Sequence, residues 1–301
     1  MKNVIPNPDL WRSWPLSRLE REYSPSSCVP SSRSFTDAYA ERSREAARRL
    51  SFRPNLRWGD GDDETFDFFP AARANAPLLI FIHGGYWQEL SKSDSLFIAP
   101  NCIANGIAYA AIEYTLAPHA SVIAIVEQCR RAVLSLSRQA SALGCDARRI
   151  FVAGSSAGAH LAAMLLVDVW QKTSAPRNDL IAGTILLSGI YDLEPLVGTY
   201  INKPLDLTNE EARILSPQRL ELGRPMPVIV AWGENETSEF KRQSQTFASK
   251  LKAADFSLTS LEIAGANHFD IVFGIADPAG ALGRAALDMI LDGTTLVANG
   301  R

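Results

Sequence analysis

Residues 149–158 read Arg-Ile-Phe-Val-Ala-Gly-Ser-Ser-Ala-Gly, and the rest of the 301-residue chain is organised around this stretch. An apolar run over 150–153 leads directly into the turn Gly154-Ser155-Ser156-Ala157-Gly158, and a helix-forming run follows over 159–166. Strand, tight turn and helix are the context in which a Gly-x-Ser-x-Gly sequence forms a nucleophile elbow. The pattern predicts Ser156 at the carboxyl edge of a sheet, beside a helix amino end that favours an oxyanion. The alternative is a glycine-rich turn without chemistry.

The remaining sequence alternates between strand and helix patterns. Apolar runs predict strands at 78–82, 107–114, 184–187, 228–231 and 258–263, with two short strands around a turn within 57–69. Amphipathic runs predict helices at 34–50, 94–105, 121–143, 240–251 and 281–291, and Pro100 is expected to kink or shorten the second of these. This alternation predicts an α/β fold with a mostly parallel central sheet that is flanked by helices on both faces.

We expect a single domain over residues 1–301, with two segments that lack a clean pattern. Residues 1–32 are rich in Pro and Ser and are expected to form no regular element, although their aromatic residues suggest packing. Together with the helix that follows, residues 1–50 are expected to form a lid or packing segment. Residues 193–225 contain several prolines and no clean periodicity, which predicts a second part of the lid. A flexible tail is expected at 293–301.

Composition excludes several classes of partner. A net charge of −3 with mixed signs argues against nucleic acid, and a small-molecule substrate is the expected partner. The four cysteines form no C-x-x-C and the four histidines show no ligand spacing, so we expect no disulfide framework, metal or cofactor. There is no signal-peptide pattern and no apolar run of about 18 residues, so a soluble, cytoplasmic protein without membrane contact is expected. Composition leaves a homodimer open.

A serine hydroxyl is a poor nucleophile near neutral pH and needs a base to take its proton. His268 lies in the loop after the last predicted strand, where the fold would deliver a base to Ser156. A histidine in a loop is otherwise a surface residue. We therefore predict His268 as the base.

The third member of such a triad is a carboxylate that orients the imidazole and stabilises its charged form. Glu236 follows strand 228–231 and is the first choice, in competition with Glu234 and Glu239 as ordinary charges at a helix start. Asp192, after the preceding strand, is the reserve. The order serine, glutamate, histidine is the order of the α/β-hydrolases.

An oxyanion needs hydrogen-bond donors. Gly84 and Gly85 follow the strand 78–82 and can offer backbone N–H groups, as can Ala157 after the nucleophile. The alternative is a plain glycine turn. His83 is expected to be a structural hydrogen-bonding residue, and His160 a buried residue behind the site.

Several motifs together resemble a known family. Strand-His83-Gly84-Gly85, Tyr114-Thr115-Leu116-Ala117-Pro118 and Gly154-x-Ser156-Ala157-Gly158 resemble the α/β-hydrolases related to hormone-sensitive lipase. Within that group the chain is similar to the arylformamidases, or kynurenine formamidases, by the following segments: His83-Gly84-Gly85-Tyr86-Trp87 with Lys92, Tyr23-Ser24-Pro25-Ser26, Ser156-Ala157-Gly158-Ala159-His160-Leu161, and Glu239-Phe240-x-Arg242-Gln243-Ser244. The resemblance runs from about Tyr23 to the final helix. One departure is Glu236, since the family often has Asp there.

The resemblance implies a cofactor-free serine hydrolase that acts through an acyl-enzyme on N-formyl-kynurenine or a related aryl formamide. Tyr86 and Trp87 are expected to bind substrate beside the oxyanion donors, although one or both rings can instead point into the core. Two alternatives stay open: a general short-chain carboxylesterase, and a non-catalytic ligand-binding protein on the same fold. The second alternative is disfavoured because the chain keeps both a nucleophile and a base.

Overall fold

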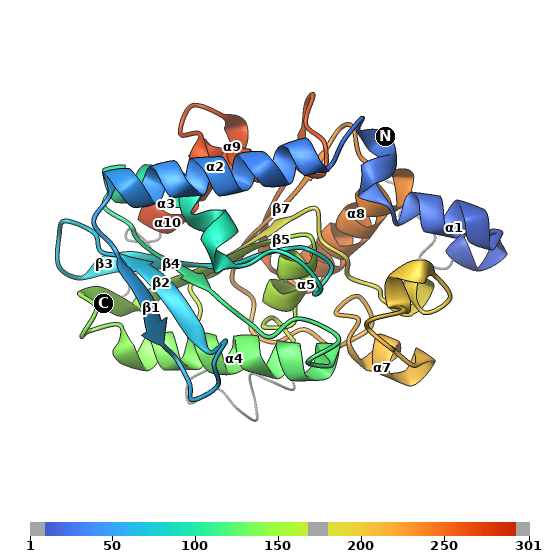
Figure 1. Cartoon of the computed structure of the whole chain (residues 1–301), viewed down its shortest axis with the longest axis horizontal. Helices are drawn as coiled ribbons and strands as arrows, with labels where there is room; N and C mark the ends of the chain where they lie inside the picture. The colour runs from blue at the N-terminus through green and yellow to red at the C-terminus, as the bar shows by residue number, and fades with distance from the viewer. Residues whose placement is uncertain (1–9, 168–179, 293–301) are drawn as a thin grey trace.

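The computed structural model describes residues 10–167 and 180–292, so the tail expected at 293–301 lies outside the described residues (Figure 1). The strands within these ranges are β1 (Arg53–Arg57), β2 (Thr65–Phe69), β3 (Ala76–Ile82), β4 (Ala108–Ile112), β5 (Cys145–Ser155), β6 (Gly183–Leu187), β7 (Pro227–Gly233) and β8 (Ser257–Ile263). They form one sheet in the order β1-β2-β4-β3-β5-β6-β7-β8. The pairs β1–β2 and β2–β4 are antiparallel and all others are parallel. This is the α/β-hydrolase fold, as predicted.

Helices cover both faces of the sheet. One face carries α2 (Arg33–Arg49), α3 (Ala99–Ala104), α9 (Phe273–Ala276) and α10 (Ala281–Asp292). The other carries α4 (Val122–Gln139), α5 (Ala157–Ala163) and α8 (Ser238–Ala253). Figure 1 shows α2 along one side of the sheet and α4 along the opposite side. None of the helices in the described ranges is long and apolar enough to cross a membrane.

Strand β3 shows how the core is divided. Leu78, Ile80 and Ile82 pack into the cluster that includes α4, whereas Leu79 and Phe81 pack into the cluster that includes α2. All five side chains are buried, as expected for a central strand with helices on both faces. The side chains of β3 therefore contribute alternately to two hydrophobic cores, one on each face of the sheet.

The N-terminal segment corrects one prediction. Residues 10–28 are largely helical, with the short 3₁₀ helices η1 (Leu10–Ser13) and η2 (Pro25–Cys28) on either side of α1 (Leu16–Glu22). Pro15 precedes α1 in an extended conformation, and the residues that follow are good helix formers. The prediction that residues 1–32 form no regular element is therefore wrong for this part, because the proline marks a helix start here.

Two other segments contain short helices. The helix predicted at 94–105 is split into the 3₁₀ helix η3 (Lys92–Ile98) and α3, with Pro100 in the first turn of α3. The segment at 193–225 contains η4 (Glu194–Leu196), η5 (Tyr200–Asn202) and α7 (Asn209–Ile214). We call 193–225 the excursion, because it leaves the sheet between β6 and β7.

Candidate active site

Ser156 stands at the tight turn between β5 and α5. Its backbone has φ 56° and ψ −117°, a conformation that non-glycine residues rarely adopt. Its N–H donates to the carbonyl of Leu187 at the end of β6, at 2.8 Å. A Cβ at Gly158 would lie 2.0 Å from the carbonyl oxygen of Ile82, so only glycine lets the helix start this close to β3. The local sequence therefore forms the elbow.

The structure brings Ser156, His268 and Glu236 together at neighbouring strand ends. His268 Nε2 lies 3.0 Å from Ser156 Oγ, and His268 Nδ1 lies 3.0 Å from Glu236 Oε2. All three residues are less than a tenth exposed. A carboxylate can only accept, so Nδ1 carries the proton that is donated to Glu236. The bare Nε2 then accepts the hydrogen bond that Ser156 Oγ donates, which is the arrangement that general-base activation requires.

The other carboxylates that competed with Glu236 have different partners. Asp192 accepts a hydrogen bond from the Arg219 guanidinium at 2.8 Å. Glu234 accepts from the backbone N–H of Gly265, and Glu239 forms two hydrogen bonds with Arg242 at 2.6 and 2.8 Å. Among these side chains the described contacts bring only that of Glu236 to His268.

The loop after β3 lies against Ser156. A Cβ at Gly84 would lie 3.3 Å from Ser156 Cβ and 2.8 Å from the carbonyl oxygen of Ser155. Within residues 10–167 and 180–292, the N–H groups of Gly84, Gly85 and Ala157 take part in no hydrogen bond. Gly84 and Gly85 also line the cavity described below, and Ala157 directly follows Ser156 as the first residue of α5. These groups are therefore free to act as donors next to Ser156.

His83 and His160 both lie close to the elbow and are fully buried. His83 faces the carbonyl of Gly84 and the carboxylate of Glu113, each at 2.9 Å, and its ring stacks on Tyr114. His160 Nε2 donates to the carbonyl of Leu215 at 2.7 Å. Burial lowers the pKa of His160 to about 4, so the ring is neutral near pH 7. Neither ring makes a hydrogen bond to Ser156, which agrees with a structural role for both.

Tyr86 and Trp87 point in different directions. The Tyr86 ring lines the cavity, and its hydroxyl donates to the carbonyl of Tyr23 at 2.5 Å. Trp87 is fully buried in the core and meets His160 edge to face, with ring centroids 5.1 Å apart. Both residues have a left-handed backbone, with φ 49° and 60°, so the loop turns sharply and carries the second ring underneath. Trp87 therefore takes the alternative orientation into the core and does not line the cavity, whereas Tyr86 does.

Ser156 and His268 open onto a cavity of about 310 Å³. One wall comes from the N-terminal segment and the excursion, through Ser24, Pro25, Ser26, Tyr200 and Ile201. Another comes from α2, η3 and the loop before α9, through Thr36, Tyr39, Asp94, Ser95, Phe97, Phe269 and Val272. At the mouth, the hydroxyls of Ser24 and Tyr200 lie 2.6 Å apart. Both segments predicted to form a lid therefore border the cavity.

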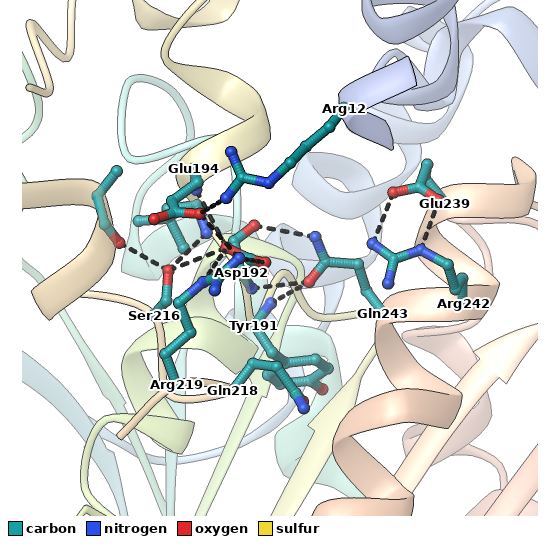
Figure 2. A network of polar contacts seen from close by, with 12 residues as sticks. Arg12, Tyr191, Asp192, Glu194, Ser216, Gln218, Arg219, Glu239, Arg242 and Gln243 are labelled. Atoms are coloured by element: carbon teal, nitrogen blue, oxygen red, sulfur yellow. Dashed lines mark hydrogen bonds and ion pairs between the residues drawn. The ribbon is translucent and has the colours of Figure 1, made fainter. Parts of the chain in front are cut away.

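A polar network joins the excursion to α8, and we call it the clamp: Asp192, Glu194, Ser216, Arg219 and Gln243, with Arg12 and Tyr23 from the N-terminal segment. Figure 2 shows the Asp192 carboxylate between Arg219 and Ser216, and Gln243 reaching the same loop from α8. The Gln243 side-chain oxygen accepts the backbone N–H groups of Tyr191 and Asp192, at 2.7 and 2.8 Å. These bonds fix on α8 the two residues that lead into the excursion.

The N-terminal segment is tied to the same network. The amide of Gln243 donates to the hydroxyl of Tyr23 at 2.8 Å, and that hydroxyl donates to Glu239 at 2.8 Å. Burial raises the pKa of Tyr23 well above its ordinary value, so the hydroxyl keeps its proton. Arg12 donates to Glu194 at 2.7 Å. The clamp therefore holds both cavity-walling segments on the body of the protein.

Two groups near the site were not predicted. Ser188 directly follows β6, and its hydroxyl donates to Glu236 Oε1 at 2.6 Å. Tyr200 stands at the cavity mouth. The only signal for Ser188 in the sequence is its position at the end of a strand, and Tyr200 lies in a segment without periodicity.

Comparison with known proteins gives consistent matches. The BD-FAE family model matches residues 68–184. A kynurenine formamidase from Danio rerio is 34% identical over 93% of this chain and 98% of its own length. One from Salmo salar is 33% identical over 89% of this chain and 94% of its own length.

Solved structures repeat the fold. A putative thioesterase from Silicibacter sp. TM1040 matches with a TM-score of 0.78 at 26% identity, over 90% of this chain and 98% of that one. A thermostable carboxylesterase from a metagenomic library matches with a TM-score of 0.64 at 22% identity, over 89% of this chain and 97% of that one. The second likeness is one of fold alone.

Proposed function

The chain belongs to the kynurenine formamidase family of α/β-hydrolases, and on this premise we propose that it is a serine hydrolase that cleaves aryl formamides such as N-formyl-kynurenine. The observation that carries the proposal is the hydrogen-bonded chain Ser156–His268–Glu236, which opens onto a partly aromatic cavity. A cavity of about 310 Å³ lies at the lower end of the range for small-molecule sites.

The first half-reaction forms a formyl-enzyme. Ser156 Oγ attacks the formyl carbon while its proton passes to His268 Nε2, and Glu236 stabilises the imidazolium through Nδ1–H. The carbonyl oxygen becomes an oxyanion beside the free N–H groups of Gly84, Gly85 and Ala157. When the intermediate collapses, the C–N bond breaks and the imidazolium gives its proton to the departing aryl amine nitrogen.

The second half-reaction returns the enzyme. A water molecule gives one proton to His268 Nε2 and attacks the formyl-ester carbon, which forms a second tetrahedral intermediate. The C–O bond to Ser156 then breaks, and Ser156 Oγ recovers the proton from the imidazolium. The product leaves as formic acid, which gives its remaining proton to solvent and becomes formate. The same donors serve both oxyanions, and no residue other than the triad has to move a proton.

Replacing the nucleophile tests the proposal. Ser156→Ala is expected to lower kcat on N-formyl-kynurenine by about 10⁴- to 10⁶-fold without loss of folding, because the nucleophile acts as a unit with its base. Ser155→Ala is the matched comparison, since Ser155 is the other hydroxyl of the pentapeptide. Turnover that survives Ser156→Ala but disappears in Ser155→Ala would contradict the assignment. Wild-type protein that hydrolyses no formamide would overturn the proposed substrate.

Short-chain esters are a second candidate substrate. The observation that favours them is the apolar part of the cavity wall, where Tyr39, Phe97 and Val272 could receive an acyl chain larger than formyl. A series of p-nitrophenyl esters from acetate to octanoate, measured as kcat/KM beside N-formyl-kynurenine, separates the two. One methylene more or less in the acyl chain is expected to change the relative kcat/KM of two esters by an amount equivalent to about 1–3 kcal/mol. Hydrolysis of the shorter esters without formamide hydrolysis would favour the short-chain esterase, and a preference for octanoate without formamide hydrolysis would point to a more general carboxylesterase.

A further inference from the structure

Ser188 has a backbone conformation that is uncommon for a residue other than glycine. It directly follows β6, has a left-handed backbone with φ 49°, and is fully buried. Its N–H donates to the carbonyl of Ala231 in β7, at 2.8 Å, so the residue is fixed between two strand ends. A non-glycine residue in this region is uncommon, and such strain is retained where surrounding structure enforces it.

The Ser188 side chain has one partner in the described structure, and that partner is Glu236. Ser188 Oγ donates to Glu236 Oε1 at 2.6 Å, and the N–H of Gly233 donates to the same oxygen. The other carboxylate oxygen, Oε2, accepts from His268. The two oxygens of Glu236 therefore have separate tasks: Oε1 is anchored by Ser188 and Gly233, and Oε2 meets the imidazole.

We propose that Ser188 is a positioning residue that orients the Glu236 carboxylate toward His268. The proposal rests on the proposed function, because it assigns Ser188 an effect on the same triad. A glutamate side chain has one more rotatable bond than an aspartate, so the orientation of the Glu236 carboxylate depends on the groups that anchor it. A hydroxyl supplies that anchor without adding positive charge, and Glu236 keeps its full charge for the imidazolium that forms during the reaction.

The test compares two buried serines. Ser188→Ala removes the hydroxyl that donates to Glu236, whereas Ser244→Ala removes an equally buried hydroxyl on α8 that has no hydrogen-bond partner among the described residues. Ser188→Ala is expected to lower kcat by about 10- to 100-fold with KM unchanged, the factor for losing one hydrogen bond to a charged group. Ser244→Ala is expected to keep the wild-type kcat. Urea unfolding of both variants shows whether a loss of folding contributes.

Two further readouts separate positioning from a merely structural role. In the Glu236→Gln background, Ser188→Ala is expected to have no additional effect on kcat, because a residue that acts through Glu236 has nothing left to orient. The proton between His268 Nδ1 and Glu236 gives a proton NMR resonance downfield of the amide region, and Ser188→Ala is expected to weaken or shift it. Ser244→Ala should leave it in place.

A failure of the Ser188 proposal can be distinguished from a failure of the proposed function. If wild-type protein hydrolyses p-nitrophenyl acetate and not N-formyl-kynurenine, the substrate proposal fails, and the same variants are compared on the ester. If neither is turned over, the NMR signal still reports the orientation of Glu236. Wild-type kcat together with an unchanged signal in Ser188→Ala would overturn the positioning role. An equal loss in the Glu236→Gln background would overturn it as well.

Discussion

Glu236 and Asp192 are both buried carboxylates that follow neighbouring strands, yet their surroundings differ. Asp192 is paired with the Arg219 guanidinium at 2.8 Å and also accepts a hydrogen bond from the backbone of Glu194. Glu236 receives neutral donors on one oxygen and His268 on the other. A carboxylate that faces a fixed cation holds the chain together, whereas one that is anchored by neutral groups remains available to an imidazole that changes its charge.

The difference explains why position after a strand does not by itself decide which carboxylate is the better candidate for the acid. Asp192 belongs to the clamp and ties the excursion to α8, as Figure 2 shows. Glu236 belongs to the carboxyl edge of β5 to β8, where strand ends place Ser156 and His268. The triad edge should therefore control turnover, and the clamp should control stability and the shape of the cavity mouth. The following predictions test that division.

Among the substitutions that test this division, the largest effect is expected at Glu236, the proposed acid. Glu236→Gln should lower kcat by up to about 10⁴-fold, because the amide favours the wrong imidazole tautomer and cannot stabilise the imidazolium. The measurement is kcat on N-formyl-kynurenine, with Glu234→Gln as the matched control on the same loop. A mild effect of Glu236→Gln beside a crippling effect of Asp192→Asn would reverse the assignment of the two carboxylates.

A pH-dependent effect on stability is expected from His160. The unfolded chain takes up this proton near the ordinary pKa of 6.5, whereas burial lowers the folded pKa to about 4. Acid therefore favours the unfolded chain between these values, and stability falls as the pH falls from about 6.5 toward 4. At about 1.4 kcal/mol per pKa unit, the full shift corresponds to about 3 kcal/mol.

The measurement is urea unfolding of wild type and His160→Gln at pH 7 and pH 5. Other groups titrate in this window, so the quantity of interest is the difference between the two proteins. The variant is expected to lose less stability than wild type on acidification. Equal losses would mean that His160 takes up its proton as readily in the folded protein as in the unfolded chain. His160 would then make no contribution to the pH dependence of stability.

Within the clamp, Asp192→Asn is expected to lower the free energy of unfolding by about 1.5–3 kcal/mol, the range for a hydrogen bond to a charged group. The side chain of Arg219 is a quarter exposed, so water screens part of the loss. Urea unfolding measures the change, and kcat is expected to stay close to wild type. A rise in KM would follow if the excursion shifts at Tyr200 and Ile201, which wall the cavity.

Much of the fold and part of the site could be predicted because they depend on periodicity and strand ends. Apolar runs such as 78–82 and 150–153 form central strands, and parallel strands bring their carboxyl ends to one edge. That rule placed Ser156, Glu236 and His268 near one another before any distance was known. The catalytic assignment of these residues remains a prediction that the substitutions above test.

The remaining features depend on contacts between residues distant in sequence. Trp87 lies in the core rather than the cavity because two successive left-handed residues, Tyr86 and Trp87, reverse the direction of the loop. The Trp87 ring then packs against His160. The partners of Ser188 and Arg219 cannot be predicted from the local sequence, because each side chain contacts a carboxylate on another segment. The helix α1 was missed because proline and serine near residue 15 suggested an irregular segment, whereas a proline also marks a helix start.

The smallest effect is expected at the edge of the clamp. Arg12 donates to Glu194 at 2.7 Å, but its side chain is 53% exposed, so solvent screens the pair. Arg12→Ala should lower the free energy of unfolding by only about 0.2–1 kcal/mol, and less at high salt, with kcat unchanged. Arg44→Ala is the matched control, because Arg44 pairs with Glu41 on α2 and joins no separate segments. If Arg12→Ala lowered the free energy of unfolding more than Asp192→Asn does, the exposed ion pair would stabilise the clamp more than the buried one. That result would contradict the proposed difference between buried and exposed pairs.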